Sequence, residues 1–470
     1  MIKFYNTPDR ALEEFKPQDP QDVKIYTCGP TVYAAPHIGN WAAFIYWDIL
    51  VRVLRANGYT VRRTINITDV GHLVSDEDEG EDKLEKGARR EGKTAWEVAE
   101  YYTDDFLEGF KKLNLVFPDN LSRATDFIPE QINIVKNLRD KGFTYEISDG
   151  IYFDTSKFPQ YADFAHLNLD ELKAGARVSF NPEKRNPSDF ALWKWTPAGQ
   201  NRDMQWEFEG RMGFPGWHLE CSAIALKTLG DTLDIHTGGI DHIPVHHTDE
   251  IAQSENFTGK KFSNYWLHAN HITSEGRKIS KSLDNGFTLQ DLQERGFSPL
   301  DYKMLILQSH YQTESDFSFE ALESAKNRLK NWRNIAALRW QTYATDNDKQ
   351  ESLPSLATKK SLLEIINNNL DTPKTLSKID EIFTDIINTP IDQISRSNLT
   401  DLLIFIDNLL GLDIIDSTPD ISDENKREII ERFNARKQKD WQTSDQIRDE
   451  LLSQNVLLRD TPTRTIWEYK

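Results

Sequence analysis

Four side chains of the kinds that hold a metal ion occur in three separate segments of the chain. His246 and Glu250 stand four positions apart in HHTDEIAQSE, a spacing that places both side chains on one face of a helix. Cys28 in YTCGPTVY and Cys221 in GWHLECSA are the only two cysteines among 470 residues. Two thiolates, an imidazole and a carboxylate form a donor set that suits a tetrahedral zinc ion. The simpler alternatives are two unrelated buried thiols or a disulfide, and the spacing alone favours buried thiols.

Two short polar motifs carry residue types that bind phosphate groups. In HIGN, His37 can donate to a phosphate oxygen, Gly39 allows close approach of the backbone, and a following helix would add a partial positive charge. In KISKS, Lys278 and Lys281 could hold a pyrophosphate leaving group as charge develops on it. Each motif taken alone is explained as well by a simpler structure, namely a surface histidine beside a turn glycine and a solvated basic loop.

The GGID segment supplies a third set of possible ligand contacts. Gly238 and Gly239 follow an apolar run and permit close backbone approach, and Asp241 adds one carboxylate for a pair of hydroxyls such as those of a ribose. A plain tight turn would need the same glycines.

These groups must be positioned by strands and helices, and the pattern around the first cysteine is that of a βαβ unit. We predict a short buried strand at 23–26, a helix at 41–58 that is apolar almost all round, and a second strand at 60–68. Parallel sheets bind ligands at the carboxyl ends of their strands, which is where Cys28 and HIGN would lie.

The remaining chain divides by pattern into further regions. Strands are predicted at 232–239 and 265–272, with the helix that carries PVHHTDE between them. Between about 115 and 215, prolines, polar turns and a hairpin around Asp149-Gly150 indicate an insertion. After residue 315 the pattern is helical until the strand-like end of the chain.

Composition limits the classes of protein to which the chain can belong. With 470 residues, 38% of them hydrophobic, it can form about three domains with buried cores. No run of about 18 apolar residues occurs, which excludes a membrane span, and the polar N-terminus has no apolar signal-peptide core. Two cysteines 193 positions apart (221 − 28) fit a reducing, cytoplasmic setting. A net charge of −19 argues against general coating of nucleic acid but is compatible with a shaped RNA held by local basic patches.

The order of these motifs resembles that of the class I aminoacyl-tRNA synthetases: HIGN near the first strand, a long insertion, a second half-sheet, and then KISKS. CGPTVYAAPHIGN, NITDV, GWHLECSA, the GGID–HH–EIAQSE run and KISKS together closely resemble the cysteinyl-tRNA synthetase family. The similarity covers residues from about 20 to 315 and resumes in SDQIRDEL and LLRDTPTRTIW.

The resemblance implies an α/β fold with a Rossmann-like parallel-sheet catalytic domain, a helical bundle and a small C-terminal domain. We expect the following division: 1–115 and 216–275 as the two halves of the catalytic domain, 116–215 as the connective insertion, 276–315 as the KMSKS-loop and stem-contact region, 316–415 as the α-helical bundle, and 416–470 as the anticodon-binding domain.

The resemblance also assigns roles to residues by position. The zinc ligands would be Cys28, Cys221, His246 and Glu250, and the groups that promote the reaction would be His37, Asn40, Lys278 and Lys281. The pocket for cysteine and ATP would be shaped by Thr31, Gly39, Asn66, Thr68, Trp217, His236, Gly238, Gly239, Asp241 and Lys281.

The sequence departs from the family's pattern at several positions. Asn40 replaces the last histidine of the HIGH motif, although an amide can still donate to a phosphate, and Ile279 replaces the methionine of KMSKS. IPVHHTDE differs from the family's commoner FPHHENE at Pro244-Val245 and at Thr248-Asp249, while the two ligand positions are kept. Asp249 and His247 stay open as alternative metal ligands, although the helical direction disfavours His247.

The reaction implied by the resemblance has two steps. The carboxylate of L-cysteine attacks the α-phosphorus of ATP, which is bound with magnesium, to give cysteinyl-adenylate and pyrophosphate. The cysteinyl group then passes to the 2′-hydroxyl of the 3′-terminal ribose of tRNA(Cys). One zinc ion per chain would recognise the substrate thiol, which loses its proton on coordination, whereas the hydroxyl of serine does not. We expect a monomer that acts in the cytoplasm without a membrane partner.

The C-terminal region is the expected tRNA-binding element. The basic segment from Lys426 to Lys439, next to Trp441, could follow phosphates, although a solvated helix face explains it equally well without the resemblance. The cysteine ligase of mycothiol synthesis is the nearest rival enzyme, but that family lacks such a terminal module. A non-catalytic RNA- or nucleotide-binding relative with a structural zinc would be expected to lack His37 or the KISKS lysines.

Overall fold

The computed structural model describes residues 1–71, 83–167, 181–197, 199, 202–274, 276–279, 285–341, 356–390, 393–460 and 465–469. The chain forms two compact units. The first consists of Met1–Glu294 with Tyr311–Phe317, and the second of Arg295–His310 with Ser318–Lys470.

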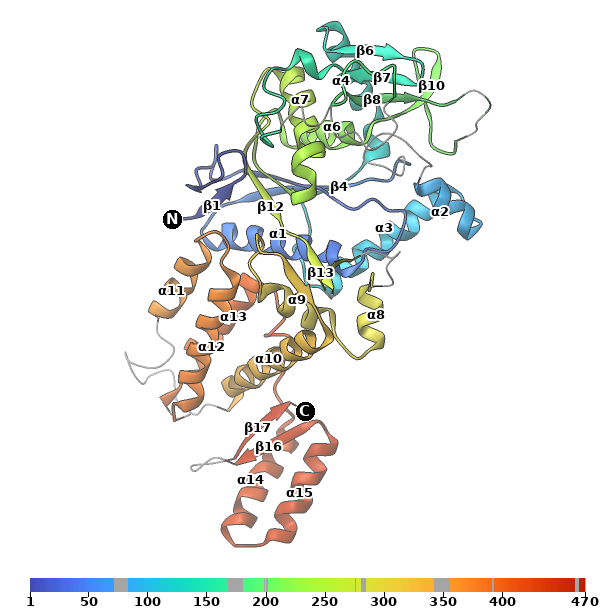
Figure 1. Ribbon diagram of the computed structural model, residues 1–470. Coiled ribbons are helices and arrows are strands. Elements are labelled where there is room, and N and C mark those ends of the chain that lie inside the picture. Colours follow the sequence, from blue (N-terminus) through green and yellow to red (C-terminus); the bar gives the residue numbers. More distant parts are fainter. Residues whose placement is uncertain are drawn as a thin grey trace. The chain divides into compact units, whose positions relative to one another are not determined.

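The first unit is built on a five-stranded parallel sheet (Figure 1). Helix α1 (Ile38–Ala56) contacts strands of this sheet, as does α6 (Trp217–Leu229) on the other side. Because helices cover it, its strands are buried along most of their length, as is typical of α/β proteins. In spatial order the strands are β12 (Ser263–Ala269), β11 (Leu233–Gly239), β3 (Val23–Thr27), β4 (Val61–Ile67) and β5 (Asn120–Arg123).

The predicted βαβ unit is confirmed, with β3 and β4 paired in parallel and α1 between them in the chain. The helix ends where Asn57 and Gly58 follow its last residue, and Gly58 has a φ of +87°, which glycine adopts without strain. On its other edge β3 pairs in parallel with β11, so that two segments about two hundred residues apart become neighbours. The carboxyl ends of β3, β4 and β11 therefore meet at one edge of the sheet.

A second, antiparallel sheet follows the first half of the parallel sheet. Its strand order is β6 (Thr144–Ile147), β7 (Gly150–Phe153), β8 (Phe190–Trp195), β10 (Arg211–Pro215) and β9 (Trp206–Phe208). The predicted hairpin is present, and its turn is Ser148-Asp149 because Ile147 pairs with Gly150. Strand β5 belongs to the parallel sheet, although it lies beyond residue 116, where we expected the insertion to begin.

The predicted strand at 265–272 is two strands. β12 ends at Ala269, and after Asn270-His271 the chain enters β13, which joins a separate three-stranded sheet. The backbone N–H of Asn270 donates to the carbonyl of Tyr311 at 2.7 Å, which draws the chain out of the parallel sheet at this point. The smaller elements are β13 (Ile272–Ser274), β14 (Arg277–Lys278), β15 (Ser315–Phe317), and the hairpin β1 (Lys3–Asn6) and β2 (Ala11–Glu14).

The other helices of the first unit lie around the two sheets. They are α2 (Lys83–Glu91), α3 (Ala95–Lys112), α4 (Ile128–Asp140), α7 (Thr248–Thr258) and α8 (Leu289–Glu294).

The second unit is mainly helical and ends in a two-stranded hairpin. The indole N–H of Trp332 on α10 donates to Asp380 on α12, and the side chain of Gln341 bonds to the backbone of Trp467 on the last strand. Its elements are α9 (Pro299–Leu307), α10 (Phe319–Ala337), α11 (Leu356–Ile366), α12 (Thr372–Asn388), α13 (Arg396–Leu410), α14 (Asp423–Lys437), α15 (Trp441–Ser453), β16 (Val456–Asp460) and β17 (Thr465–Tyr469).

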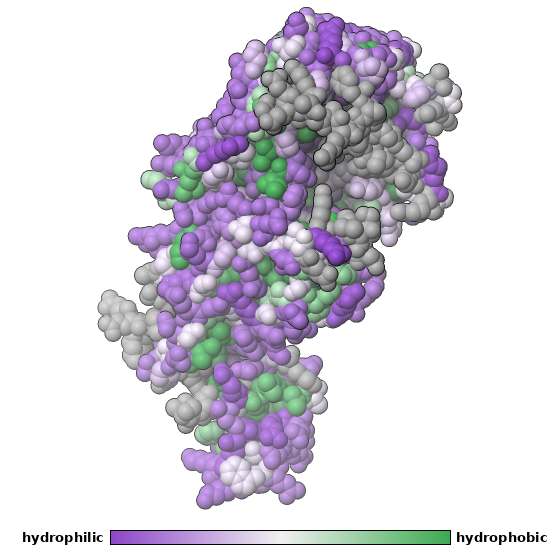
Figure 2. Space-filling view, viewed as in Figure 1, coloured by the Kyte–Doolittle hydropathy of each residue, from purple (hydrophilic) through white to green (hydrophobic). Residues whose placement is uncertain are grey.

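Hydrophilic residues predominate on the face of the molecule shown in Figure 2, with smaller hydrophobic patches between them. None of the described helices combines the length and the apolar composition needed to cross a membrane.

Candidate active site

The four donor side chains singled out in the sequence lie together in the first unit. One ligand atom from each of Cys28, Cys221, His246 and Glu250 can be chosen so that all four lie within 4.8 Å of one another. Nε2 of His246 is 2.8 Å from Oε1 of Glu250, and Sγ of Cys28 is 4.0 Å from the same oxygen. Both cysteines are free thiols, so the disulfide alternative does not hold.

Each donor is placed by a different local structure. Cys28 directly follows β3, and its N–H donates to the carbonyl of Thr237 on β11. Cys221 lies on α6, whose N-cap residue is Gly216. Gly216 packs directly against β8, where only glycine fits, because a Cβ there would lie 1.9 Å from the carbonyl oxygen of Ala191. His246 lies in a π-helical turn (Ile243–His247) that leads into α7, and Glu250 lies in the first turn of α7. Such π-helical turns are frequent at functional sites.

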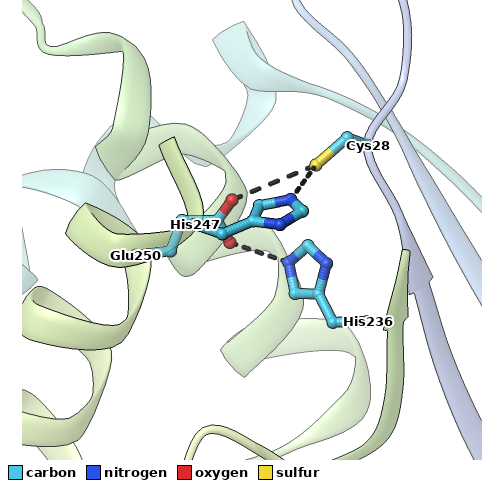
Figure 3. A group of neighbouring side chains, drawn as sticks. All are labelled: Cys28, His236, His247 and Glu250. Carbon is cyan, nitrogen blue, oxygen red and sulfur yellow. Dashed lines mark hydrogen bonds and ion pairs between the residues drawn. The ribbon is translucent and has the colours of Figure 1, made fainter. Parts of the chain in front are cut away.

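A second set of donors overlaps the first. Cys28, His236, His247 and Glu250 also bring one ligand atom each to within 4.8 Å of the others, and Figure 3 shows them pointing toward one another. Nε2 of His247 is 3.4 Å from Sγ of Cys28, and Nε2 of His236 is 2.9 Å from Oε2 of Glu250. His247 therefore lies within reach of the same donors, although we expected helical direction to disfavour it as a ligand. Because both sets use Cys28 and Glu250, they could hold one ion in either of two ways but not two ions at once.

The electrostatic environment favours the charged forms of Glu250 and His246, which face one another in this cluster. Burial alone would raise the pKa of Glu250, but His236 and His246 outweigh it and lower the pKa to about 2. Burial would lower the pKa of His246, yet the Glu250 carboxylate and then Cys221 raise it well above its usual value. Burial lowers the pKa of His247, which keeps this imidazole neutral at physiological pH.

Glycine is required where β11 passes the histidines. A Cβ on Gly238 would lie 2.6 Å from Cε1 of His247 and 2.8 Å from Nδ1 of His242. The first glycine of GGID therefore lets two imidazoles approach the strand. Asp241, in the 3₁₀ turn after β11, is exposed, and its carboxylate is available to a ligand at the edge of the sheet.

The residues expected to shape the amino-acid pocket also converge here. Oδ1 of Asn66 accepts from the N–H of Gly29 at 2.7 Å, and Nδ2 of Asn66 donates to Thr68 at 3.0 Å. Thr68 in turn pairs with Thr31 in an isolated parallel bridge. The indole ring of Trp217 lies 4.7 Å from the His246 ring, centre to centre.

The HIGN turn lies beside Ile279 of KISKS and beside Phe287 and Thr288. His37 is the N-cap of α1 and forms an antiparallel bridge with Thr288, while the N–H of Ile38 donates to the carbonyl of Phe287 at 2.8 Å. A Cβ on Gly39 would lie 3.8 Å from Cβ of Ile279. Oδ1 of Asn40 accepts from the N–H of His37.

The two lysines of the KISKS motif are described only in part. The backbone of Lys278 is in β14, while its side chain and the whole of Lys281 lie outside the described residues.

Several residues that build this site were not identified from the sequence. Nδ1 of His247 is 2.8 Å from Nε2 of His268, whose Nδ1 is 2.6 Å from the Thr7 hydroxyl. On the other side, His218 bonds to His246, and Asp249 bonds to Tyr161. The clustering of histidines near HHTDE was a signal for His242, but nothing in the local sequence pointed to Thr7 or Tyr161.

Comparison with known proteins defines the class to which this fold and site belong. The family model for the catalytic domain of class I (C) tRNA synthetases matches residues 14–327. The Mycobacterium tuberculosis methionyl-tRNA synthetase, solved in complex with methionyl-adenylate, shares the fold with a TM-score of 0.61 over 84% of this chain and 91% of that chain, at 15% identity. The fold and the matched catalytic domain are those of a class I aminoacyl-tRNA synthetase.

Curated relatives narrow the class further. The cysteine–tRNA ligase of Treponema denticola is 39% identical over 99% of this chain and 99% of that protein. Cysteine–tRNA ligase 1 of Burkholderia lata is 40% identical over 98% of this chain and 95% of that protein. The chain belongs to the cysteine–tRNA ligase family.

Proposed function

We propose that this protein activates L-cysteine with ATP as cysteinyl-adenylate and transfers the cysteinyl group to the 3′-terminal ribose of tRNA(Cys). One observation carries the choice of amino acid: Cys28, Cys221, His246 and Glu250 lie close enough together to share an ion at the carboxyl edge of the sheet. A site that selects a thiol substrate needs a metal ion of this kind, because side-chain contacts alone discriminate cysteine from a near-isostere such as serine by only about a hundredfold.

The donor set fits zinc. Two thiols, one imidazole and one carboxylate, nearly all buried, match the ligands and the coordination number that zinc prefers in proteins. When bound, zinc would favour the thiolate form of substrate cysteine over any form of serine. The protein's own contribution is to hold the donors in place: the backbone of Cys28 is fixed to β11, and His236 holds the second oxygen of Glu250.

Activation of cysteine depends on positioning and on stabilisation of negative charge. His37 and Asn40 lie at the N-terminal end of α1, where backbone N–H groups and the helix dipole favour a phosphate. Lys278 and Lys281 would neutralise the pyrophosphate as it leaves, and magnesium would arrive with ATP. No side-chain nucleophile is required for this step.

The C-terminal helices of the second unit are the proposed contact for the anticodon. Trp441 at the start of α15 is 57% exposed, and the guanidinium of Arg436 lies 5.9 Å from its ring centre. An exposed indole beside a cation is suited to stacking with an unpaired base. Lys437 and Lys439 follow in the chain and would contact the RNA backbone.

The working environment follows from the two thiols. Cys28 and Cys221 must stay reduced to hold an ion, so we propose that the protein acts in the cytoplasm. The proposal also takes the protein to be a monomer, as the resemblance implies.

Pyrophosphate exchange tests the proposal. ATP–pyrophosphate exchange should depend on L-cysteine, and with L-serine at equal concentration it should be slower by clearly more than the roughly hundredfold that side-chain contacts alone provide. Aminoacylation of tRNA(Cys) should follow with the same amino acid. Comparable exchange with serine would contradict the proposed selectivity.

A further inference from the structure

Hydrogen bonds link His246 to a tyrosine from the antiparallel-sheet region. Nδ1 of His246 lies 2.9 Å from Nδ1 of His218, and Nε2 of His218 lies 3.2 Å from Oδ2 of Asp249. The other oxygen of Asp249 accepts from the Tyr161 hydroxyl at 2.6 Å. All four residues are at most 5% exposed, so these bonds form in the interior of the unit.

The direction of these bonds fixes the position of each proton. A carboxylate only accepts, so Asp249 requires the proton of a neutral His218 to be on Nε2. His218 then has its lone pair on Nδ1 and accepts there. In the neutral form that can bind a metal, His246 must therefore donate from its own Nδ1, which places its lone pair on Nε2. That nitrogen is the one that lies 2.8 Å from Oε1 of Glu250, inside the donor cluster.

We propose that Tyr161, Asp249 and His218 are positioning residues that fix the tautomer and the ring orientation of His246 for the metal. The proposal rests on the proposed function, because it takes zinc as the ion that His246 binds. Partners of this kind orient a ligating imidazole and strengthen it as a donor, and their loss typically weakens metal binding about 10- to 100-fold.

The carboxylate of Asp249 sets the direction of this chain of bonds. An amide can turn either its oxygen or its nitrogen toward His218 and therefore permits both tautomers, whereas a carboxylate permits one. Tyr161 is also held in place, since its hydroxyl lies 3.3 Å from the carbonyl oxygen of Ser188.

Zinc affinity of conservative variants tests the proposal. The full chain would be stripped of metal, and zinc alone would be titrated in competition with a chromophoric chelator. Asp249→Asn should raise the dissociation constant for zinc about tenfold or more, and Tyr161→Phe should raise it by a smaller factor. The matched control is Tyr145→Phe, which removes a buried hydroxyl that donates to Asp189 at 2.7 Å and whose hydrogen-bond partners among the described residues include no histidine. This control should bind zinc as tightly as the unaltered chain.

Thermal unfolding of the metal-free proteins separates positioning from a loss of folding. The three variants should unfold at similar midpoint temperatures. Asp249→Asn and Tyr161→Phe should nevertheless bind zinc more weakly than Tyr145→Phe does. Unchanged affinity in both variants would overturn the proposal, and so would an equal loss in the control. If Asp249→Asn does not fold, Tyr161→Phe against its control decides the question. Absence of zinc binding by the unaltered chain would instead refute the proposed function itself.

Discussion

Single residues in the first unit combine burial with charge, and Asp69 is an example outside the donor cluster. This carboxylate directly follows Thr68 and is 1% exposed. Burial raises its pKa to about 6, although Thr125 opposes the shift by donating its hydroxyl and its backbone N–H. Asp69 thus ties the end of β4 to the turn after β5 at the cost of an ionised group in the interior.

The raised pKa of Asp69 predicts a pH-dependent stability. The folded chain holds the proton to a higher pH than the unfolded chain does, so the free energy of unfolding should fall as the pH rises from about 4 to about 6. Asp69→Asn removes this titration, and its stability relative to the unaltered chain should increase by up to about 3 kcal/mol over that range. Chemical denaturation at several pH values measures the difference. Parallel pH profiles of the two proteins would contradict it.

At the scale of elements, α1 and α3 pack closely because one helix lacks a side chain at the contact. Gly109 on α3 faces Trp41 on α1, and a Cβ there would lie 2.3 Å from Cζ2 of the indole. The indole is 2% exposed and also stacks on Phe106, with 5.2 Å between ring centres. The N-terminal end of α1, which carries HIGN, therefore rests on this contact.

Gly109→Ala should destabilise the chain even though alanine is the better helix former. Overpacking costs about 1–3 kcal/mol, against a gain of about 1 kcal/mol in helix propensity. Trp41→Phe removes the indole atoms that the new methyl group would meet, so Gly109→Ala should cost less in that background. Denaturant unfolding of the double-mutant cycle gives the coupling. Additive effects of the two substitutions would show that the contact does not limit packing.

The local sequence predicted those elements in which an apolar run is bounded by residues that end a helix or a strand, such as glycine. The βαβ unit of β3, α1 and β4 is such a case, as is the strand β11 before GGID. The break between β12 and β13 was missed because it depends on a bond from Asn270 to the distant Tyr311. The same holds for Tyr161, which reaches Asp249 only in the folded chain. The convergence of Cys28, Cys221, His246 and Glu250 agrees with the sequence-based expectation. The sequence left His247 open as an alternative ligand, and the structure places it within reach of Cys28 and Glu250, in a π-helical turn that the sequence did not predict.

At the scale of the whole molecule, the two proposed reaction steps draw on different parts of the chain. The donor cluster and HIGN lie in the first unit, whereas Trp441 and its neighbouring cations lie in the second. Activation of cysteine should therefore be separable from recognition of tRNA.

Trp441→Ala should reduce aminoacylation without changing activation. Loss of one base–aromatic stack costs about 1–3 kcal/mol, so kcat/KM for tRNA(Cys) should fall by about tenfold, while cysteine-dependent pyrophosphate exchange stays the same. Phe117→Ala serves as the control, because this aromatic is 46% exposed in the first unit. An equal loss of exchange activity in Trp441→Ala would contradict the division of tasks.

Zinc content combined with exchange activity tests the central claim most directly. The purified chain should contain one zinc ion, Cys221→Ala should lose both the ion and cysteine-dependent exchange, and His247→Ala should retain the ion because His247 belongs only to the alternative donor set. Loss of zinc from His247→Ala but not from Cys221→Ala would show that the alternative set holds the ion. Full cysteine-dependent exchange by protein from which all zinc has been removed would contradict the claim that a metal recognises the substrate thiol.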